Sequence, residues 1–210
     1  SIKYAVERNQ FGRSISKYGA IRYKLAEQTI QTFVVECSIY RATQNIQDAI
    51  DALIADGMDK NKATLKGIEQ YAAECAMMKV LASDALDYVA DEGVQIHGGM
   101  GYSAETRVER AYRDARINRI FEGTNEINRL LTVDMLLKRA MKGEMDLLGA
   151  AQEVAKEILA VPSFNSGNGE AFASEKQVIR NMKKAALMIA GAAVQKFMMK
   201  LSHEQEIMMN

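Results

Sequence analysis

The sequence has few of the residues that interrupt helices or cross-link a chain. Its 210 residues include one proline, Pro162, and no tryptophan, against 13 methionines. Because proline is the strongest helix breaker, its near absence favours long, uninterrupted helices. The two cysteines, Cys37 and Cys75, are too few for a disulfide framework. Both fall on apolar positions of helical patterns, which predicts buried thiols in a reducing compartment.

A net charge is also lacking, since 27 basic residues balance 27 acidic ones. Without a net charge or a basic block, no long-range field directs the chain to nucleic acid or to an anionic membrane. No apolar run approaches the length of about 18 residues that a membrane span needs, and the N-terminus has no pattern of a secretory signal. Only two histidines are present and no cysteine pair lies near either, so we expect no metal site.

Apolar residues recur every three or four positions along most of the chain, which is the period of an amphipathic helix. Two long stripes of this kind are joined by the turn sequence "ADGMDKN", so the two helices should be antiparallel. No segment alternates apolar and polar residues over the length of a strand. The sequence therefore predicts an all-α fold, an antiparallel up-and-down four-helix bundle over residues 1–143. Its helices are expected at residues 20–54, 62–90, about 103–117, with Ser103 as a cap, and about 125–141.

Residues 144–210 form a separate helical extension in this interpretation. The stretch 161–172, "VPSFNSGNGEAF", is rich in glycine, serine and asparagine and is predicted to be a linker. The sequence "SEKQ" from Ser174 to Gln177 has the pattern of a capping box, and an apolar stripe follows it from Ile179 to Leu201. A core face against the bundle is the favoured interpretation of this stripe. Its neighbouring lysines leave contact with a membrane surface as the alternative.

Three segments between the predicted helices carry residues suited to chemistry. They are "ERNQFG" (7–12), "QIHGGMGY" (95–102) and "FEGTNEI" (121–127). Arginine offers a fork of donors for phosphate, and glycine lets a backbone approach a ligand closely. Each segment also has a plainer explanation: a solvated arginine at a helix end, a glycine run that ends a helix, or a loop carboxylate in water. Thr124 is the predicted N-cap of the helix that follows Glu122.

Taken together, "RNQFG", "QIHGGMGY" and "RDARINRIFEGTNEINRLL" resemble, in order and spacing, the C-terminal helical domain of the acyl-CoA dehydrogenases. The resemblance covers about residues 1–141. The motif "FEGTNEI" followed by a further helical segment is most similar to the very-long-chain branch. The resemblance implies a flavoprotein of fatty acid oxidation that converts fatty acyl-CoA to trans-2-enoyl-CoA.

The resemblance also gives the residues of the "FEGTNE" motif their roles. Glu122 corresponds to the general base that removes the α-proton of the acyl-CoA, while the β-hydrogen leaves as hydride to N5 of FAD. Phe121 and Gly123 would contact the substrate. Thr124 and Glu126 would bind the cofactor of their own subunit, although the medium-chain pattern has an uncharged amide at position 126.

The two other motifs are implied to bind FAD across a subunit interface. Arg8 and Gln10 would reach the pyrophosphate of the neighbouring subunit's cofactor, and Phe11 would pack against it. The "QIHGG" segment would contact the adenosine half of the same cofactor. Its residues are Gln95, Ile96, His97, Gly98 and Gly99.

The resemblance further implies an electron-transfer flavoprotein as acceptor, a homodimer or homotetramer, and a location in a bacterial cytoplasm or a mitochondrial matrix. Complete members of the family also have an N-terminal helical domain and a middle β-domain, and nothing in this sequence resembles either. The expectation is therefore a fragment cut at both ends and inactive alone. The alternative is a non-catalytic helical module for oligomerisation or for contact with a membrane surface.

Overall fold

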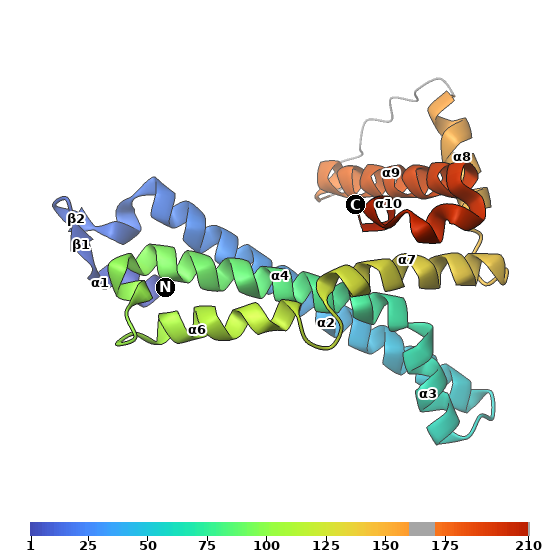
Figure 1. Cartoon of the computed structure of the whole chain (residues 1–210), viewed down its shortest axis with the longest axis horizontal. Helices are drawn as coiled ribbons and strands as arrows, with labels where there is room; N and C mark the ends of the chain where they lie inside the picture. Colours follow the sequence, from blue (N-terminus) through green and yellow to red (C-terminus); the bar gives the residue numbers. More distant parts are fainter. Residues whose placement is uncertain (160–170, 210) are drawn as a thin grey trace. The chain divides into compact units, whose positions relative to one another are not determined.

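The computed structural model describes residues 1–159 and 171–209, and these residues are almost entirely helical (Figure 1). The all-α prediction is confirmed. The contacts divide the chain into two units, Ser1–Thr132 and Val133–Asn210. This division falls inside the helix Asn125–Met141, ahead of the boundary after residue 143 that the sequence predicts between bundle and extension. The predicted domain boundary stays a prediction. None of the described helices is long and apolar enough to cross a bilayer.

The first unit begins with a short helix and a small hairpin. Helix α1 (Ile2–Glu7) leads into β1 (Asn9–Gln10), which pairs antiparallel with β2 (Arg13–Ser14), and a 3₁₀ turn η1 (Ile15–Lys17) follows. The hairpin was not predicted, because two-residue strands are too short to produce an alternating pattern.

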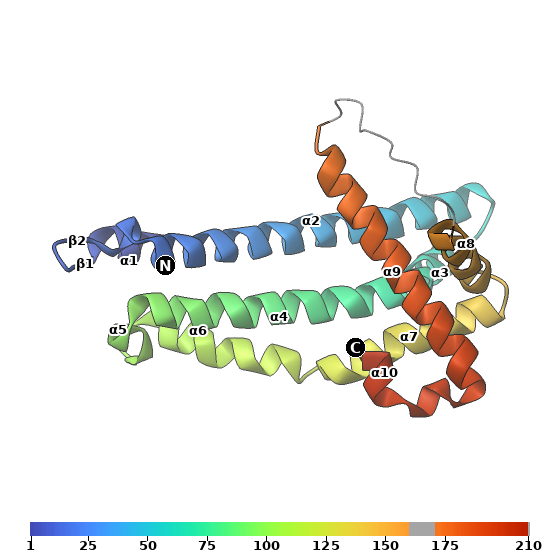
Figure 2. The same ribbon diagram turned by 90° about the horizontal axis from the view of Figure 1, so that it is seen from above.

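Two long antiparallel helical segments form the body of this unit. Helix α2 (Gly19–Ala55) lies beside α3 (Lys60–Gln70) and α4 (Ala72–His97), as Figure 2 shows for α2 and α4. An ion pair joins Lys24 to Glu92, and the Gln28 amide donates to the Val89 carbonyl at 2.9 Å. The predicted antiparallel pair is confirmed. The single helix expected at residues 62–90 is wrong, because the backbone leaves the helical conformation at Tyr71 (φ −108°, ψ 19°) and divides it into α3 and α4.

The rest of the first unit packs against α4. It comprises α5 (Gly99–Tyr102), α6 (Arg107–Arg116), the 3₁₀ turn η2 (Ile117–Arg119) and the start of α7 (Asn125–Met141). Ser103 does not cap α6, which begins only after Thr106. Instead, the Thr106 hydroxyl donates to the Met100 carbonyl at 2.7 Å, and this bond holds the connection in a turn.

The second unit contains α8 (Leu147–Leu159), α9 (Ala173–Phe197), the 3₁₀ segment η3 (Met198–His203) and α10 (Gln205–Met209). Helices α8 and α9 pack together, and Lys184 forms an ion pair with Glu157 between them. The predicted capping box is wrong: α9 already starts at Ala173, and the Ser174 hydroxyl bonds to the Glu175 carboxylate instead. Most of the predicted linker lies outside the described residues.

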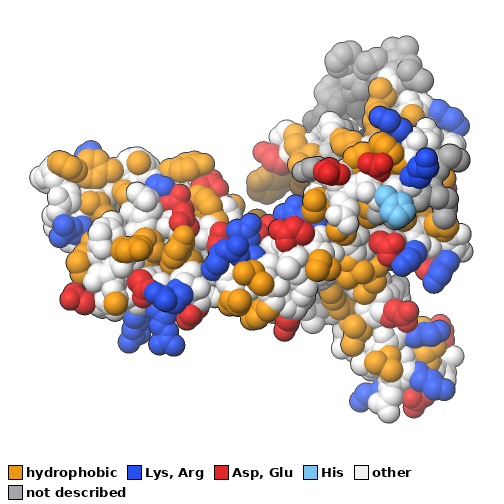
Figure 3. Space-filling view, in the orientation of Figure 1, with side chains coloured by type: hydrophobic (Ala, Val, Ile, Leu, Met, Phe, Trp, Pro, Cys, Tyr) orange, Lys and Arg blue, Asp and Glu red, His pale blue; other side chains and the backbone are white. Residues whose placement is uncertain are grey.

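Both thiols are exposed, so the prediction of buried cysteines is wrong. Apolar residues of α2 lie on more than one side of the helix, and within the chain α2 packs mainly against α3 and α4. Beside Cys37, Phe33 and Tyr40 are consequently 65% and 69% exposed. In α9, Ile179, Met182 and Ile189 are likewise exposed. Figure 3 shows apolar side chains spread along one face of the chain.

Candidate active-site loop and cofactor groove

The predicted cofactor-binding residues of the first two motifs lie together in one groove. The β1–β2 hairpin and η1 form one side of it, and the C-terminal end of α4 with α5 forms the other. The groove has a volume of about 740 Å³. It is lined by Arg8, Gln10, Phe11, Gln95, Ile96, His97, Gly98 and Gly99, and by apolar parts of Tyr4, Ile15, Tyr18, Ile21 and Met100.

A two-residue turn presents Phe11 at the tip of the hairpin. Both Phe11 (φ +52°) and Gly12 (φ +83°) are in the left-handed region, as the type I′ turn of a tight hairpin requires. This conformation is unfavourable for a residue with a large side chain. Tyr18 supports the turn, because its hydroxyl donates to the Gln10 carbonyl at 2.9 Å and its ring meets Phe11 edge-on. Phe11 is nevertheless 91% exposed, so its ring is available to a partner.

The floor of the groove is fixed by His97, the last residue of α4. Its ring stacks on Tyr4 with centroids 4.1 Å apart, and its Nδ1 bonds to the Gly93 carbonyl at 2.7 Å. Gly98 then ends the helix with φ +60°, which glycine adopts readily. His97 is therefore a packed residue that joins α1 to α4. The glycine run ends a helix, which is the plainer of the two explanations given for it.

Three polar side chains of the groove have no partner among the described residues. The side chains of Arg8, Gln10 and Gln95 are exposed and make no hydrogen bond or ion pair with the described part of the chain. A guanidinium and two amides above an apolar floor fit a ligand that carries both phosphate and flat ring systems. FAD is such a ligand, so the residues present fit the cofactor that the motifs imply.

The third motif forms the loop between η2 and α7. Glu122 (φ +55°) and Gly123 (φ +80°) are consecutive left-handed residues that turn the chain into α7. The Glu122 carboxylate is exposed and has no hydrogen bond or ion pair within the described residues, and Phe121 beside it is 47% exposed. The Thr124 hydroxyl oxygen accepts a hydrogen bond from the Ile127 N–H at 3.3 Å, which confirms the predicted N-cap.

Glu126 lies in the first turn of α7 and completes the cap. Hydrogen bonds from its own backbone N–H and from the Thr124 hydroxyl lower the pKa of the Glu126 carboxyl. A carboxylate is favoured here also because the N-terminus of a helix carries a partial positive charge. Both residues bond within the first turn of α7, and their contact with the cofactor stays a prediction.

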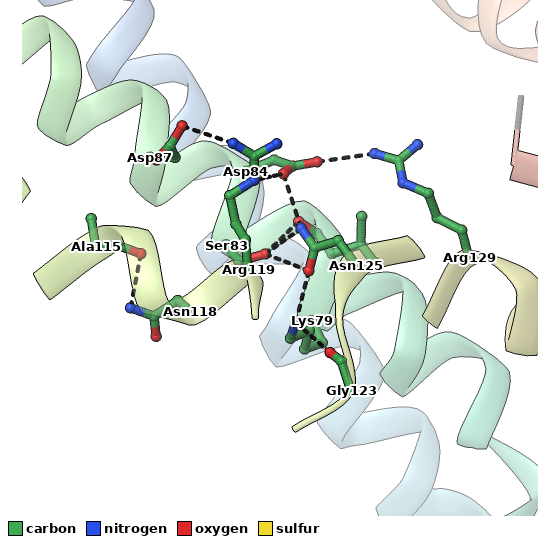
Figure 4. A network of polar contacts seen from close by, with 11 residues as sticks. Lys79, Ser83, Asp84, Asp87, Ala115, Asn118, Arg119, Gly123, Asn125 and Arg129 are labelled. Carbon is green, nitrogen blue, oxygen red and sulfur yellow. Dashed lines mark hydrogen bonds and ion pairs between the residues drawn. The ribbon is translucent and has the colours of Figure 1, made fainter. Parts of the chain in front are cut away.

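A polar network holds this loop against α4 (Figure 4). Lys79 Nζ donates to the Gly123 carbonyl at 2.8 Å and to Asn125 Oδ1 at 2.7 Å. Asn125, only 4% exposed, donates in turn to Ser83 Oγ at 2.9 Å and to Asp84 Oδ1 at 3.0 Å.

Two arginines extend the network on the Asp84 side. Arg119 bonds to Asp84 and to Asp87, both at 3.1 Å, and Arg129 bonds to Asp84 at 3.0 Å. The sequence analysis missed all of these residues. For the members on α4, the one visible signal is a set of polar residues between positions 79 and 87, which an analysis of hydrophobic periodicity does not consider.

The groove and the loop lie at different points along α4. Gln95 belongs to the groove and Lys79 to the loop, so the two positions are about 24 Å apart along the helix axis, from the rise per residue of an α-helix. The structure thus brings eight of the predicted site residues together in the groove and the other five in the loop and the first turn of α7. Among residues 1–159 and 171–209, no three His, Cys, Asp or Glu side chains gather as a metal site would need.

Comparisons with known proteins identify relatives of the whole chain. A family profile described as "Acyl-CoA dehydrogenase, C-terminal domain" matches residues 1–137, and a second profile with the same description matches residues 181–210. A "Probable acyl-CoA dehydrogenase" of Bacillus subtilis is 41% identical over 210 residues, which is 100% of this chain and 35% of the relative. The rat mitochondrial "Very long-chain specific acyl-CoA dehydrogenase" is 36% identical over 146 residues, 70% of this chain and 18% of the relative.

A solved structure shares the fold. The acyl-CoA dehydrogenase from Bacillus anthracis, determined in complex with FAD, superposes with a TM-score of 0.89 at 44% identity, covering 99% of this chain and 34% of that one. The chain thus spans about a third or less of the length of these relatives. The profile that matches residues 1–137, together with a fold shared along nearly the entire chain, shows that the chain belongs to the acyl-CoA dehydrogenase family, in which it corresponds to the C-terminal domain.

Proposed function

We propose that this chain is the C-terminal part of a FAD-dependent enzyme that oxidises fatty acyl-CoA to trans-2-enoyl-CoA, and that Glu122 is its general base. One observation carries the proposal. Glu122 is an exposed carboxylate without a partner among the residues that the structure describes, on a loop that α4 anchors at the following residue. A general base needs this combination of a free proton acceptor and a fixed position.

The residues around Glu122 have roles that follow from their chemistry. The α-C–H bond of the acyl-CoA breaks, its proton passes to a carboxylate oxygen of Glu122, and the electron pair enters the new double bond. When bound, FAD would supply the acceptor for the β-hydrogen, which leaves as hydride. Gly123 has no side chain to obstruct the acyl group, and the half-exposed Phe121 offers it an apolar contact. Glu122 and Gly123 are both left-handed, and the Gly123 carbonyl is bonded to Lys79 of α4.

FAD would be held by two separate groups of residues: Thr124 and Glu126 at the start of α7, for the cofactor of their own subunit, and the residues of the groove. Arg8, Gln10 and Gln95 supply donors for the pyrophosphate and adenosine, and Phe11 supplies a ring that can pack on the cofactor. Because the groove is far along α4 from the loop of Glu122, we assign the groove to the flavin of a neighbouring subunit. This division supports a homodimer or homotetramer. Electron-transfer flavoprotein is the proposed electron acceptor, from the family resemblance alone. The chain alone is expected to be inactive.

A non-catalytic interaction module is the alternative. It is favoured by the exposed apolar side chains of α2, such as Phe33 and Tyr40, and of α9, such as Met182 and Ile189. The α9 residues lie close in sequence to lysines and would suit contact with a membrane surface. Flavin binding by the complete protein separates this alternative from the enzyme.

We also propose a reducing compartment, either a bacterial cytoplasm or a mitochondrial matrix. Two cysteines are too few for a disulfide framework, and both are exposed, so a reducing compartment would keep them as thiols. Labelling of both thiols in freshly lysed cells, without prior reductant, tests this proposal.

The test of the enzymatic function is the Glu122→Gln substitution in the complete enzyme that carries this domain. The amide keeps the shape of the side chain but cannot accept the α-proton, so kcat should fall by about 10²- to 10⁴-fold, the range of a general base. Bound flavin should be unchanged. Glu69→Gln on α3, another exposed carboxylate, is the control. A Glu122→Gln enzyme that turns over at the parent rate would remove Glu122 from the mechanism.

A further inference from the structure

The loop that carries Glu122 has an unfavourable backbone and needs an external support. Two consecutive residues, Glu122 and Gly123, have positive φ angles of 55° and 80°. For Glu122 this region is sterically disfavoured, so an isolated peptide would leave it readily. Contacts from outside the loop must therefore select this conformation.

The contacts converge on one carbonyl oxygen. Gly123 O accepts hydrogen bonds from Lys79 Nζ and from Asn128 Nδ2, both at 2.8 Å. Asn128 is five residues further on in α7, so its bond is local in sequence. Lys79 is 44 residues away in sequence and lies on α4. It is the contact that ties the peptide after Glu122 to the body of the unit.

Lys79 also binds the residue that starts α7. A second acceptor, Asn125 Oδ1, takes a hydrogen bond from its ammonium group at 2.7 Å. Asn125 is buried and fixed by Ser83 and Asp84, which lie one turn further along α4 than Lys79. A single ammonium group thus bridges the loop to a rigid anchor, as Figure 4 shows. The bonds of a charged donor are stronger than those between neutral groups.

Building on the proposed role of Glu122, we infer that Lys79 is a positioning residue, which sets the place of the Glu122 carboxylate by holding the Gly123 carbonyl. Lys79 acts only through the position of the loop and takes no part in proton transfer to or from the substrate. Loss of its ammonium group frees the loop while the remaining network still holds Asn125 to α4. Because a displacement of about 1 Å can cost roughly 10²-fold in rate, proton removal should be sensitive to this loss.

The experiment compares Lys79→Met, Lys79→Arg and Lys66→Met in the complete enzyme. Methionine keeps an apolar stem but donates no hydrogen bond, whereas arginine retains donors. Lys66 is an exposed lysine of α3 and serves as the matched control. The measurements are flavin reduction by acyl-CoA in single turnovers, the isotope effect with α-deuterated acyl-CoA, and hydrogen exchange of the peptide that spans residues 120–125.

In Lys79→Met we expect flavin reduction to slow by about 10- to 100-fold, with a larger isotope effect because α-C–H cleavage becomes more fully rate-limiting. Hydrogen exchange in the loop should be faster, while flavin content and melting temperature stay close to those of the parent. Lys79→Arg should fall between the parent and Lys79→Met, and Lys66→Met should equal the parent. A merely structural role would lower the melting temperature without changing the isotope effect.

Failure of this inference is distinct from failure of the proposed function. If Glu122→Gln is inactive but Lys79→Met keeps the parent rate and loop exchange, Glu122 stays the base and Lys79 is not its support. If Lys79→Met is unfolded, Lys79 serves overall stability and the inference is wrong. If Glu122→Gln is active, the proposed function falls, and with it the positioning role, whatever the exchange of the loop.

Discussion

Two glycines of the same short helix should respond oppositely to alanine. In α5, a Cβ atom on Gly101 would lie 2.5 Å from the Val94 carbonyl oxygen, 2.8 Å from His97 Cβ and 2.9 Å from Val94 Cα. Two of these three atoms belong to the backbone of α4, so no side-chain rotation can relieve the contact. A Cβ on Gly99 would have no atom within 4 Å. The pair therefore separates the effect of crowding from the general effect of replacing glycine.

The magnitude follows from two opposing terms. Overpacking costs about 1 to 3 kcal/mol, and the backbone clash at Gly101 puts this site at the upper end. Alanine regains about 0.5 to 1 kcal/mol over glycine in a helix. The net loss for Gly101→Ala is about 2 kcal/mol, which lowers the melting temperature of a chain of this size by about 4 to 8 °C. Gly99→Ala should be neutral or raise the melting temperature by about 1 to 3 °C.

Thermal unfolding of the 210-residue chain, followed by far-ultraviolet circular dichroism, measures both effects. The parent and the two variants should have the same spectrum at low temperature, since the helices themselves are retained. A Gly101→Ala chain that melts at or above the parent temperature would show that α5 can move away from α4 without cost. A Gly99→Ala chain that falls as far as Gly101→Ala would show that the loss has another cause.

Two further predictions concern the cofactor and acid stability. Arg8→Ala should weaken FAD retention by the complete oligomer roughly 10- to 100-fold, since a charge-assisted contact contributes on the order of 1.5 to 3 kcal/mol. Flavin occupancy in a dilution series measures this, with the exposed Arg22→Ala as control, and equal occupancy for both would refute it. The pKa of Glu126 is lowered from its ordinary 4.5, so its carboxylate stabilises the fold above that pH and loses this effect as the pH falls through the lower value. At neutral pH the Glu126→Gln chain should have a lower melting temperature than the parent, and in acid the two melting temperatures should be equal. A difference in melting temperature that does not change with pH would contradict this role of Glu126.

Local signals in the sequence predicted the helices and part of their ends. The apolar period located α2 and α7, and Thr124 was identified as a cap because its hydroxyl acts within one turn. The same local logic failed at Ser174 and at Tyr71. A capping pattern fits equally well one residue inside a helix, and no glycine or proline marks the break at Tyr71.

The support of the site could not be predicted in the same way. Lys79 and Gly123 meet only after α4 and the loop have folded against each other, and no periodicity links residues 44 positions apart. The exposure of Cys37 was missed for a related reason. An apolar helix face indicates that the face will be buried, but the pattern does not say whether it packs against the same chain or against a partner. The motif resemblance was enough to propose Glu122 as the base. The contact of Lys79 with the loop that carries Glu122 is visible only in the folded structure.

The dependence of the loop on α4 limits how this domain can be recombined. The segment from Arg119 to Arg129 is continuous in sequence and looks like a cassette that could be exchanged between related enzymes. Its bonding partners Lys79, Ser83, Asp84 and Asp87 lie on a different helix. A chimera that receives the loop without these four residues has the Glu122 carboxylate but lacks the hydrogen bonds and ion pairs that hold the loop. The natural unit of exchange is thus discontinuous: the loop and the middle of α4 must be inherited together.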